Sequence, residues 1–190
     1  MRLILASSSP RRRELLEKAG LAFDVIPSRG EEIHDENLGM EALCMENAKI
    51  KAMDVAVQYP DAVVIGADTL VFLSQVPLGK PKNLDEAKSM LIRLSGRSHQ
   101  VCTGVCISRD QEVRTFSCTT EVEFRELNEA MIQDYLATTQ PLDKAGGYGI
   151  QDHGERIVSQ ITGSYENVMG LPVEMVVAAL QGMELPIGER

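Results

Sequence analysis

Hydrophobic residues along this chain occur in two patterns, short continuous runs and helical spacing. Segments of the two kinds alternate along the first half of the chain. Short, nearly continuous apolar runs predict strands. Runs with apolar residues three and four apart predict helices, as where Ala48, Ala52 and Val55 fall on one side. The predicted strands cover residues 2–6, 23–26, 62–65, 99–108, 112–124 and 157–161, with residues 70–73 as a candidate continuation of the strand at 62–65 past Asp68 and Thr69. The predicted helices cover residues 10–18, 40–59, 84–94, 127–137 and 172–181.

Capping residues support these helices. Ser9 is placed as an N-cap before Pro10, and Gly20 follows the end of the same helix. Asn83 and Asn128 are candidate N-caps of two later helices. The segments between elements are predicted as turns at residues 74–77 and 109–111, a glycine-rich loop entering a short strand at 146–150, a helix entry at 163–172, and a frayed tail beyond 181.

The order of the elements predicts the fold class. Strands and helices alternate in the first half of the chain, and a hairpin follows in the second half. This order indicates an α/β fold with a mixed sheet. The chain has 190 residues and no low-complexity linker, so we expect a single domain over residues 1–190.

Composition excludes several classes of protein. The net charge is -9 and aromatic residues make up only 4%, which argues against a nucleic-acid partner bound by a basic face or by base stacking. No apolar run approaches the ~20 residues of a membrane span, and the start of the chain turns polar at once. The four cysteines form no Cys-x-x-Cys pair, so we expect free thiols, no zinc site and a cytoplasmic location.

The charge is unevenly distributed. Residues 1–30 contain six basic and three acidic side chains, whereas residues 31–60 contain two basic and seven acidic ones. Three arginines, Arg11, Arg12 and Arg13, stand at a predicted helix N-terminus, where positive charge is normally unfavourable. The acidic protein therefore has a local cationic site.

The segment Ser7-Ser8-Ser9-Pro10-Arg11-Arg12 joins a predicted strand to this helix. Free backbone N–H groups, hydroxyls and arginines favour a phosphate site there. The alternative is a well-capped helix whose arginines face solvent. No Gly-x-x-x-x-Gly-Lys-Ser/Thr motif occurs, so the segment is not a Walker P-loop.

Acidic residues follow two of the predicted strands. Asp68 comes directly after the apolar run at 62–65, and ligands of open α/β sheets bind beyond the carboxyl ends of strands. Asp68 is therefore a candidate for catalysis or metal binding; the alternative is a local turn bond to the backbone. Glu31 and Glu32 follow the strand at 23–26, with a solvated acidic turn as the alternative.

Two further segments suit a nucleotide. Lys80 stands between a glycine and a proline, which suits a held phosphate contact or a surface turn. At most one of Lys49 and Lys51 is expected to face a site, since they lie on different sides of a helix. Gln151 ends a segment with three glycines, and its amide can read a base edge. Together these features indicate a metal-dependent enzyme acting on a nucleotide polyphosphate.

The chain resembles the Maf family of nucleoside triphosphate pyrophosphatases over nearly its whole length. The segments that carry the resemblance, in order, are Ala6-Ser7-Ser8-Ser9-Pro10-Arg11-Arg12, Gly66-Ala67-Asp68-Thr69, Lys80-Pro81, Leu94-Ser95-Gly96, His99-Gln100-Val101, residues 143–151 and residues 163–172. The resemblance implies a strongly twisted mixed sheet with flanking helices, and two lobes around a deep cleft, similar to inosine triphosphate pyrophosphatases. It also implies a possible homodimer.

The resemblance further implies a reaction and a set of site residues. The reaction is cleavage between the α and β phosphates of a nucleoside triphosphate. Asp68 is implied to be the proton acceptor, and to hold Mg²⁺ or Mn²⁺ together with Glu32; such oxygen ligands suit these hard ions. Phosphate contacts are implied for Ser7, Ser8, Arg12, Lys51 and Lys80. Contacts that select the base are implied for Arg11, Thr69 and Gln151.

The segment Tyr148-Gly149-Ile150-Gln151 is similar to the branch that prefers dTTP and UTP. The alternatives are 7-methyl-GTP, modified pyrimidine nucleotides, or a nucleotide-sensing regulator of cell division without turnover. Three positions depart from the family pattern: Glu31 stands where Asp is common, Gln140 where Glu is common, and Gly147 where Ala is common.

Overall fold

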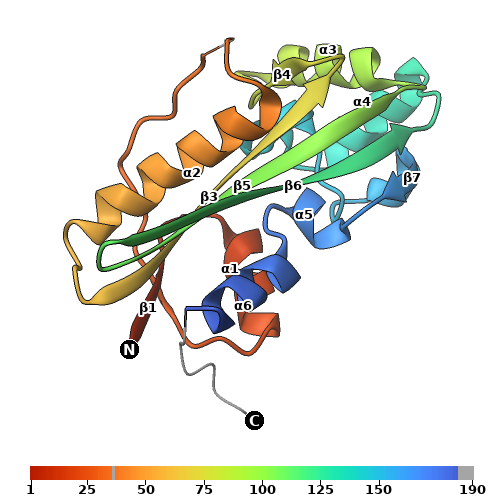
Figure 1. Cartoon of the computed structure of the whole chain (residues 1–190). Helices are drawn as coiled ribbons and strands as arrows, with labels where there is room; N and C mark the ends of the chain where they lie inside the picture. Colours follow the sequence, from red (N-terminus) through yellow and green to blue (C-terminus); the bar gives the residue numbers. More distant parts are fainter. Residues whose placement is uncertain (36, 184–190) are drawn as a thin grey trace. The chain divides into compact units, whose positions relative to one another are not determined.

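The structure, a computed structural model, describes residues 1–35 and 37–183, so most of the predicted frayed tail lies outside the described residues (Figure 1). The strands are β1 (Arg2–Leu5), β2 (Asp24–Val25), β3 (Ala62–Leu73), β4 (Val76–Leu78), β5 (Ser98–Arg109), β6 (Glu112–Phe124) and β7 (Val158–Thr162). The α-helices are α1 (Pro10–Lys18), α2 (Met40–Ala56), α3 (Leu84–Leu94), α4 (Glu129–Thr138), α5 (Tyr165–Met169) and α6 (Val173–Gln181). Single 3₁₀ turns occupy Pro141–Asp143, Ala145–Gly147 and Gly154–Arg156.

The mixed α/β class is confirmed. The sheet has seven strands in the order β2-β1-β3-β5-β6-β7, with β4 paired to β3. Strand β1 is parallel to both β2 and β3, whereas β4 is antiparallel to β3 and β7 is antiparallel to β6. Strands β5 and β6 are neighbours joined by two residues, which is the predicted hairpin.

The described chain divides into two compact units. The first comprises Met1–Thr69, Thr103–Cys118 and the chain from Gly170 on, and the second comprises Leu70–Cys102 and Thr119–Met169. The chain passes from one unit to the other within β3, β5 and β6. The expectations of a single domain and of a deep cleft stay predictions.

In the first unit, helix α2 packs on the sheet at two glycines. A β-carbon on Gly66 of β3 would lie 2.3 Å from the carbonyl oxygen of Ala48 and 2.6 Å from the backbone nitrogen of Ala52. One on Gly104 of β5 would lie 2.2 Å from the carbonyl carbon of Cys44. Real β-carbons do not approach backbone atoms this closely, so only glycine permits this contact between helix and sheet.

One cluster in the core of the first unit consists of small and β-branched side chains around α2 and strands β1, β3 and β5. Its buried residues are Ile4, Ala6, Ala48, Ala52, Val55, Ala62, Val64 and Cys106. The alanines of α2 keep its axis close to the strands, in agreement with the apolar helix face predicted from the sequence.

The core of the second unit contains an aromatic cluster. Phe124 and Tyr148 lie edge-to-face with ring centroids 4.8 Å apart, and His99 packs against both rings. His99 Nε2 lies 2.7 Å from the Tyr148 hydroxyl. Burial lowers the pKa of His99 to about 4, because the protonated ring would lose its hydration.

Most predicted elements and caps are confirmed, and two predictions are wrong. Residues 148–150 do not form the short strand expected after the glycine-rich loop. Gly146 and Gly147 have φ angles of 72° and 74°, which turn the chain away from an extended course. The turn predicted at 74–77 is shorter: Ser74 and Gln75 both have positive φ, and β4 begins at the next residue. Helix α5 lies inside the segment predicted only as a helix entry.

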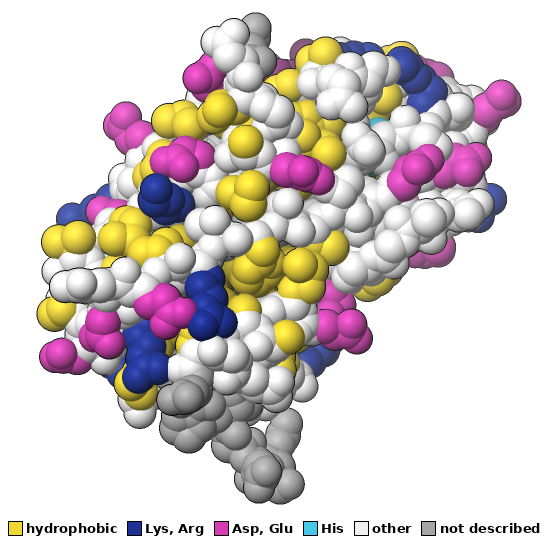
Figure 2. All heavy atoms as spheres, viewed as in Figure 1, with side chains coloured by type: hydrophobic (Ala, Val, Ile, Leu, Met, Phe, Trp, Pro, Cys, Tyr) yellow, Lys and Arg dark blue, Asp and Glu magenta, His cyan; other side chains and the backbone are white. Residues whose placement is uncertain are grey.

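The surface agrees with the composition. On the face drawn in Figure 2, the described Lys and Arg side chains are interspersed with Asp and Glu and form no continuous basic stripe. Among the residues that the structure describes, no helix is long and apolar enough to cross a bilayer.

Replacing Gly66 or Gly104 by alanine should destabilise the protein by about 3 kcal/mol, because the added methyl group meets backbone atoms that cannot rotate away. Urea unfolding measures this loss. Gly79→Ala is the matched control, since a β-carbon there has no atom within 4 Å. Equal stability of all three variants would contradict the close packing of α2.

The pKa of His99 makes stability depend on pH. The unfolded chain binds a proton on His99 below about pH 6.5, whereas the folded chain does so only near pH 4, so stability is lost as the pH falls between these values. We expect about 2 kcal/mol of loss from this group between pH 7 and pH 5. Urea unfolding of the wild type and His99→Gln at both pH values measures it; identical pH dependence of the two proteins would refute this assignment.

Candidate active site

Asp68 lies inside strand β3, because residues 70–73 continue the strand past Asp68 and Thr69, the continuation that the sequence analysis had offered. The strand runs on through Asp68 and Thr69 to Leu73 and is buried at nearly every position. The neighbouring strand β1 pairs with β3 only as far as Leu5 opposite Ile65. The strand end that leaves room at Asp68 is therefore that of β1. The Asp68 side chain is 5% exposed.

A half-buried lysine joins Asp68 to Glu32. The ammonium nitrogen of Lys51, on α2, lies 2.6 Å from Asp68 Oδ1 and 2.7 Å from Glu32 Oε1. The Lys51 side chain is 15% exposed, so these ion pairs are shielded from solvent. Lys49 is exposed, as expected from its place on another side of the helix, and Glu31 is exposed as well. Glu32, not Glu31, is thus the acidic residue next to Asp68.

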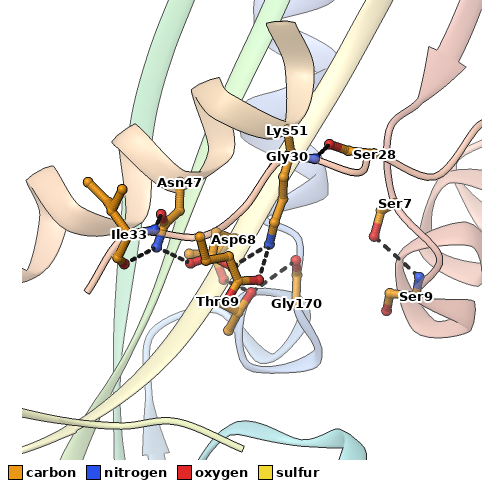
Figure 3. Close-up of polar contacts among 12 residues, drawn as sticks. Ser7, Ser9, Ser28, Gly30, Ile33, Asn47, Lys51, Asp68, Thr69 and Gly170 are labelled. Carbon is orange, nitrogen blue, oxygen red and sulfur yellow. Dashed lines mark hydrogen bonds and ion pairs between the residues drawn. The ribbon is translucent and has the colours of Figure 1, made fainter. Parts of the chain in front are cut away.

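Asn47 also contacts Asp68, and the sequence analysis did not identify it. Its side-chain nitrogen lies 3.2 Å from Asp68 Oδ2, and its side chain bonds the backbone of Ile33 in both directions (Figure 3). The signal that could have found it is spacing, because Asn47 precedes Lys51 by four residues and shares its helix face.

The loop that carries Glu32 is tied to the same helix further along. Asp54 Oδ2 accepts hydrogen bonds from the Ser28 hydroxyl at 3.0 Å and from the Arg29 N–H at 2.8 Å. The bond from the Arg29 backbone is the main reason that the pKa of Asp54 is lowered. Helix α2 therefore holds this loop at both ends.

Arg12 is the buried cation of the predicted phosphate segment. Its side chain donates to the carbonyl of Gly170 at 2.8 Å, to Ser7 Oγ at 3.1 Å and to Thr69 Oγ1 at 3.0 Å. All three acceptors are neutral. Burial lowers the pKa of Arg12, and the negative charge of Asp68 opposes this shift. A buried guanidinium held by neutral groups retains its charge for an anionic ligand.

The other residues of this segment differ in exposure. Ser9 caps α1 as predicted and accepts from the Arg12 N–H. Ser7 is buried and accepts from both Arg12 and the Ser9 N–H, so it helps to orient Arg12. Ser8 is exposed and Arg11 is half-buried. The first unit therefore brings together Ser7, Arg12, Glu32, Lys51, Asp68 and Thr69.

Lys80 and Gln151 belong to the second unit, and both are exposed there. The Gly79 carbonyl, next to Lys80, accepts from the Gly146 N–H of the glycine-rich loop. The Tyr135 hydroxyl bonds both the N–H and the carbonyl of Gly149. The phosphate contact of Lys80 and the base contact of Gln151 stay predictions.

Lys144 holds the same loop through two ion pairs. Its ammonium lies 2.7 Å from Asp143 Oδ1 and 3.0 Å from Asp152 Oδ2. A β-carbon on Gly149 would lie 2.7 Å from the Lys144 side chain, so glycine lets the loop close over it. At Gly147, where the family pattern often has alanine, the positive φ angle favours glycine.

The carboxylates predicted to hold a divalent cation can share one. Glu32 and Asp68 both point at a single positive charge, the Lys51 ammonium. Mg²⁺ is commonly bound by one or two carboxylates together with water and substrate phosphates. Among the described residues, no group of three or more His, Cys, Asp and Glu side chains is placed to hold a metal. The remaining ligands would be water and phosphate, which this pair of carboxylates suits.

These features define an α/β protein with a buried carboxylate–lysine–arginine site on its sheet. The sequence profile described as "Maf-like protein" matches residues 2–183, and the chain belongs to the Maf family. The family resemblance seen in the sequence is thereby confirmed.

Several curated relatives are named "dTTP/UTP pyrophosphatase". One from Akkermansia muciniphila is 49% identical over 181 residues, which cover 95% of this chain and 96% of the relative. Another, from Bacillus velezensis, is 49% identical and covers 95% of both chains. A solved nucleoside-triphosphatase / dITP/XTP pyrophosphatase from Mycobacterium abscessus aligns over 97% of this chain at 12% identity with a TM-score of 0.45, a likeness that carries no argument here.

Lys51→Met should destabilise the protein by about 3 kcal/mol, because it leaves the buried Asp68 carboxylate without its cation. Adding Asp68→Asn should restore part of this loss, since the unpaired charge is then removed. Urea unfolding of the two single variants and the double variant measures both effects. A double variant as unstable as the sum of the singles would contradict the buried ion pair.

Proposed function

We propose that this protein is a nucleotide hydrolase that converts dTTP and UTP to the nucleoside monophosphate and pyrophosphate, and so clears these nucleotides from the pool. The observation that carries the proposal is the sequence identity of 49%, over 95% of this chain, to relatives named dTTP/UTP pyrophosphatase. The site supports it, because the buried Asp68 carboxylate lies close to the half-buried Lys51 and the buried Arg12, and cations in a shielded site stabilise the charge of a reacting polyphosphate.

In the proposed reaction, water attacks the α phosphorus. The bond between that phosphorus and the oxygen bridging to the β phosphate breaks, and pyrophosphate leaves. Asp68 accepts the proton of the attacking water as general base. Its two oxygens are held by Asn47 and Lys51, so its position is fixed before the substrate binds.

Lys51 and Arg12 supply the positive charge that the triphosphate needs. A triphosphate carries about four negative charges, and cations placed in a shielded site stabilise the charge that develops on the leaving group. The buried Arg12 is oriented for this role by Ser7, Thr69 and Gly170. Ser8, Arg11, Lys80 and Gln151 complete the proposed contacts to phosphate and base.

Metal dependence belongs to the same proposal. Glu32 and Asp68 are the residues that would hold Mg²⁺ or Mn²⁺, together with water and substrate phosphate. When bound, such an ion neutralises phosphate charge and lowers the pKa of water. We place the reaction in the cytoplasm, where nucleotide pools are found, and expect a homodimer.

Purified protein should release pyrophosphate from dTTP and UTP when Mg²⁺ or Mn²⁺ is present, and Asp68→Asn should lower the rate by about 10²–10⁴-fold through loss of the proton acceptor. Pyrophosphate release measured over a panel of purine, pyrimidine, modified pyrimidine and 7-methyl-GTP substrates tests both points.

The outcomes of this assay separate the alternatives. Equal rates on purine and pyrimidine triphosphates would contradict the selectivity given to Gln151. Preference for 7-methyl-GTP would move the protein to another branch of the family. Binding of dTTP without turnover would favour a nucleotide sensor, and full activity of Asp68→Asn would refute the role of that residue.

A further inference from the structure

Helix α2 turns one polar side toward the catalytic carboxylate and the loop that carries Glu32. Asn47, Lys51 and Asp54 are spaced four and three residues apart, so they lie on one face of the helix. Figure 3 shows Asn47 and Lys51 both pointing from this helix toward Asp68. Lys51 forms ion pairs with Asp68 and Glu32, whereas Asp54 accepts hydrogen bonds from the Ser28 hydroxyl and the Arg29 N–H.

Asn47 is 1% exposed, and its side-chain amide forms hydrogen bonds with two residues, Ile33 and Asp68. Its Oδ1 accepts from the Ile33 N–H at 2.8 Å, and its Nδ2 donates to the Ile33 carbonyl and to Asp68 Oδ2, both at 3.2 Å. The orientation of the amide follows from this arrangement, because a backbone N–H can only donate. The amide nitrogen must therefore face Asp68.

The two oxygens of Asp68 consequently have different partners. Oδ2 accepts from Asn47, and Oδ1 accepts from Lys51. A carboxylate held by the ammonium alone could rotate about its terminal bond, whereas a second donor on the other oxygen fixes its plane. The same Asn47 side chain also fixes the backbone one residue after Glu32.

We infer that Asn47 is the positioning residue of the active site: its hydrogen bond fixes the plane of the Asp68 carboxylate relative to Lys51 and the reacting water. The inference rests on the proposed function. Asn47 touches Asp68, not the substrate, so its removal lowers kcat and leaves the KM for dTTP nearly unchanged.

A purely structural role predicts a different pattern. A buried amide that only anchors a loop would affect stability, and Asp54 anchors the same loop without touching Asp68. Asp54→Leu is therefore the matched control for Asn47→Leu: both replace a polar side chain of α2 by an apolar one of similar size, and both release one end of the loop.

The first experiment compares pyrophosphate release from dTTP by the wild type and these two variants, per amount of folded protein. We expect Asn47→Leu to lower kcat by about 10–100-fold with KM changed less than about threefold, since losing the partner of an active-site group has effects of this size. Asp54→Leu should keep kcat within about threefold of the wild type. If Asn47→Leu does not fold, Asn47→Ser, which admits water beside Ile33, carries the same test.

The second experiment measures the contact itself by urea unfolding. Asn47→Leu is made in the wild type and in Asp68→Ala, where the acceptor is absent. Asn47→Leu raises the equilibrium constant of unfolding in both backgrounds. The factor of this rise should be about tenfold smaller in Asp68→Ala than in the wild type, as expected for loss of a hydrogen bond to a charged group. Equal effects in both backgrounds would overturn the inference.

The two experiments also separate this inference from the proposed function. A wild type that releases no pyrophosphate removes the proposed function, while the unfolding cycle still decides whether Asn47 holds Asp68. An active wild type together with an equally active, folded Asn47→Leu variant overturns the positioning role alone. A loss of kcat of the same size in both leucine variants also overturns it, because loop anchoring would then explain the effect.

Discussion

The close approach of helix α2 to strands β3 and β5 is the contact on which the rest of the first unit depends. Gly66 and Gly104 leave no side chain between helix and sheet, so backbone meets backbone. Gly66 lies two residues before Asp68, on the same strand. This proximity lets the short side chain of Asn47 and the long one of Lys51 both reach the Asp68 carboxylate. If α2 lay further from β3, the long Lys51 side chain would still reach Asp68, but the hydrogen bond from the shorter Asn47 side chain would be lost.

The cost of burying charge is the second constraint, and in this site two carboxylates share one lysine ammonium. Two carboxylates next to one another would repel, and the Lys51 ammonium between them removes this cost. Arg12 differs from Lys51 in that its three hydrogen-bond acceptors are neutral. The site thus contains one cation that is paired within the protein and one whose charge remains for a ligand. An acidic protein can in this way hold an anionic substrate.

Sequence reasoning identified most elements and the residues that carry charge, since caps, apolar periods and clustered arginines act locally. It placed Ser9, Asn83 and Asn128 correctly as helix caps. It offered the continuation of β3 through Asp68, but it did not show that β1 pairs with β3 only as far as Leu5 opposite Ile65. It also missed Asn47, because an amide inside a helix has no charge or motif to mark it. Its partners come from a loop and a strand far away in the sequence.

The sequence by itself determined the α/β class, most of the helices and the family, because hydrophobic period, capping residues and ordered motifs are local features of the chain. Only the tertiary structure decided that both oxygens of Asp68 have a partner, that Lys51 joins Asp68 to Glu32 and not to Glu31, and that Arg12 is buried among neutral acceptors. The reason is physical: an ion pair or hydrogen bond requires atoms within about 3 Å, and such distances between remote residues arise only when helix and sheet have packed.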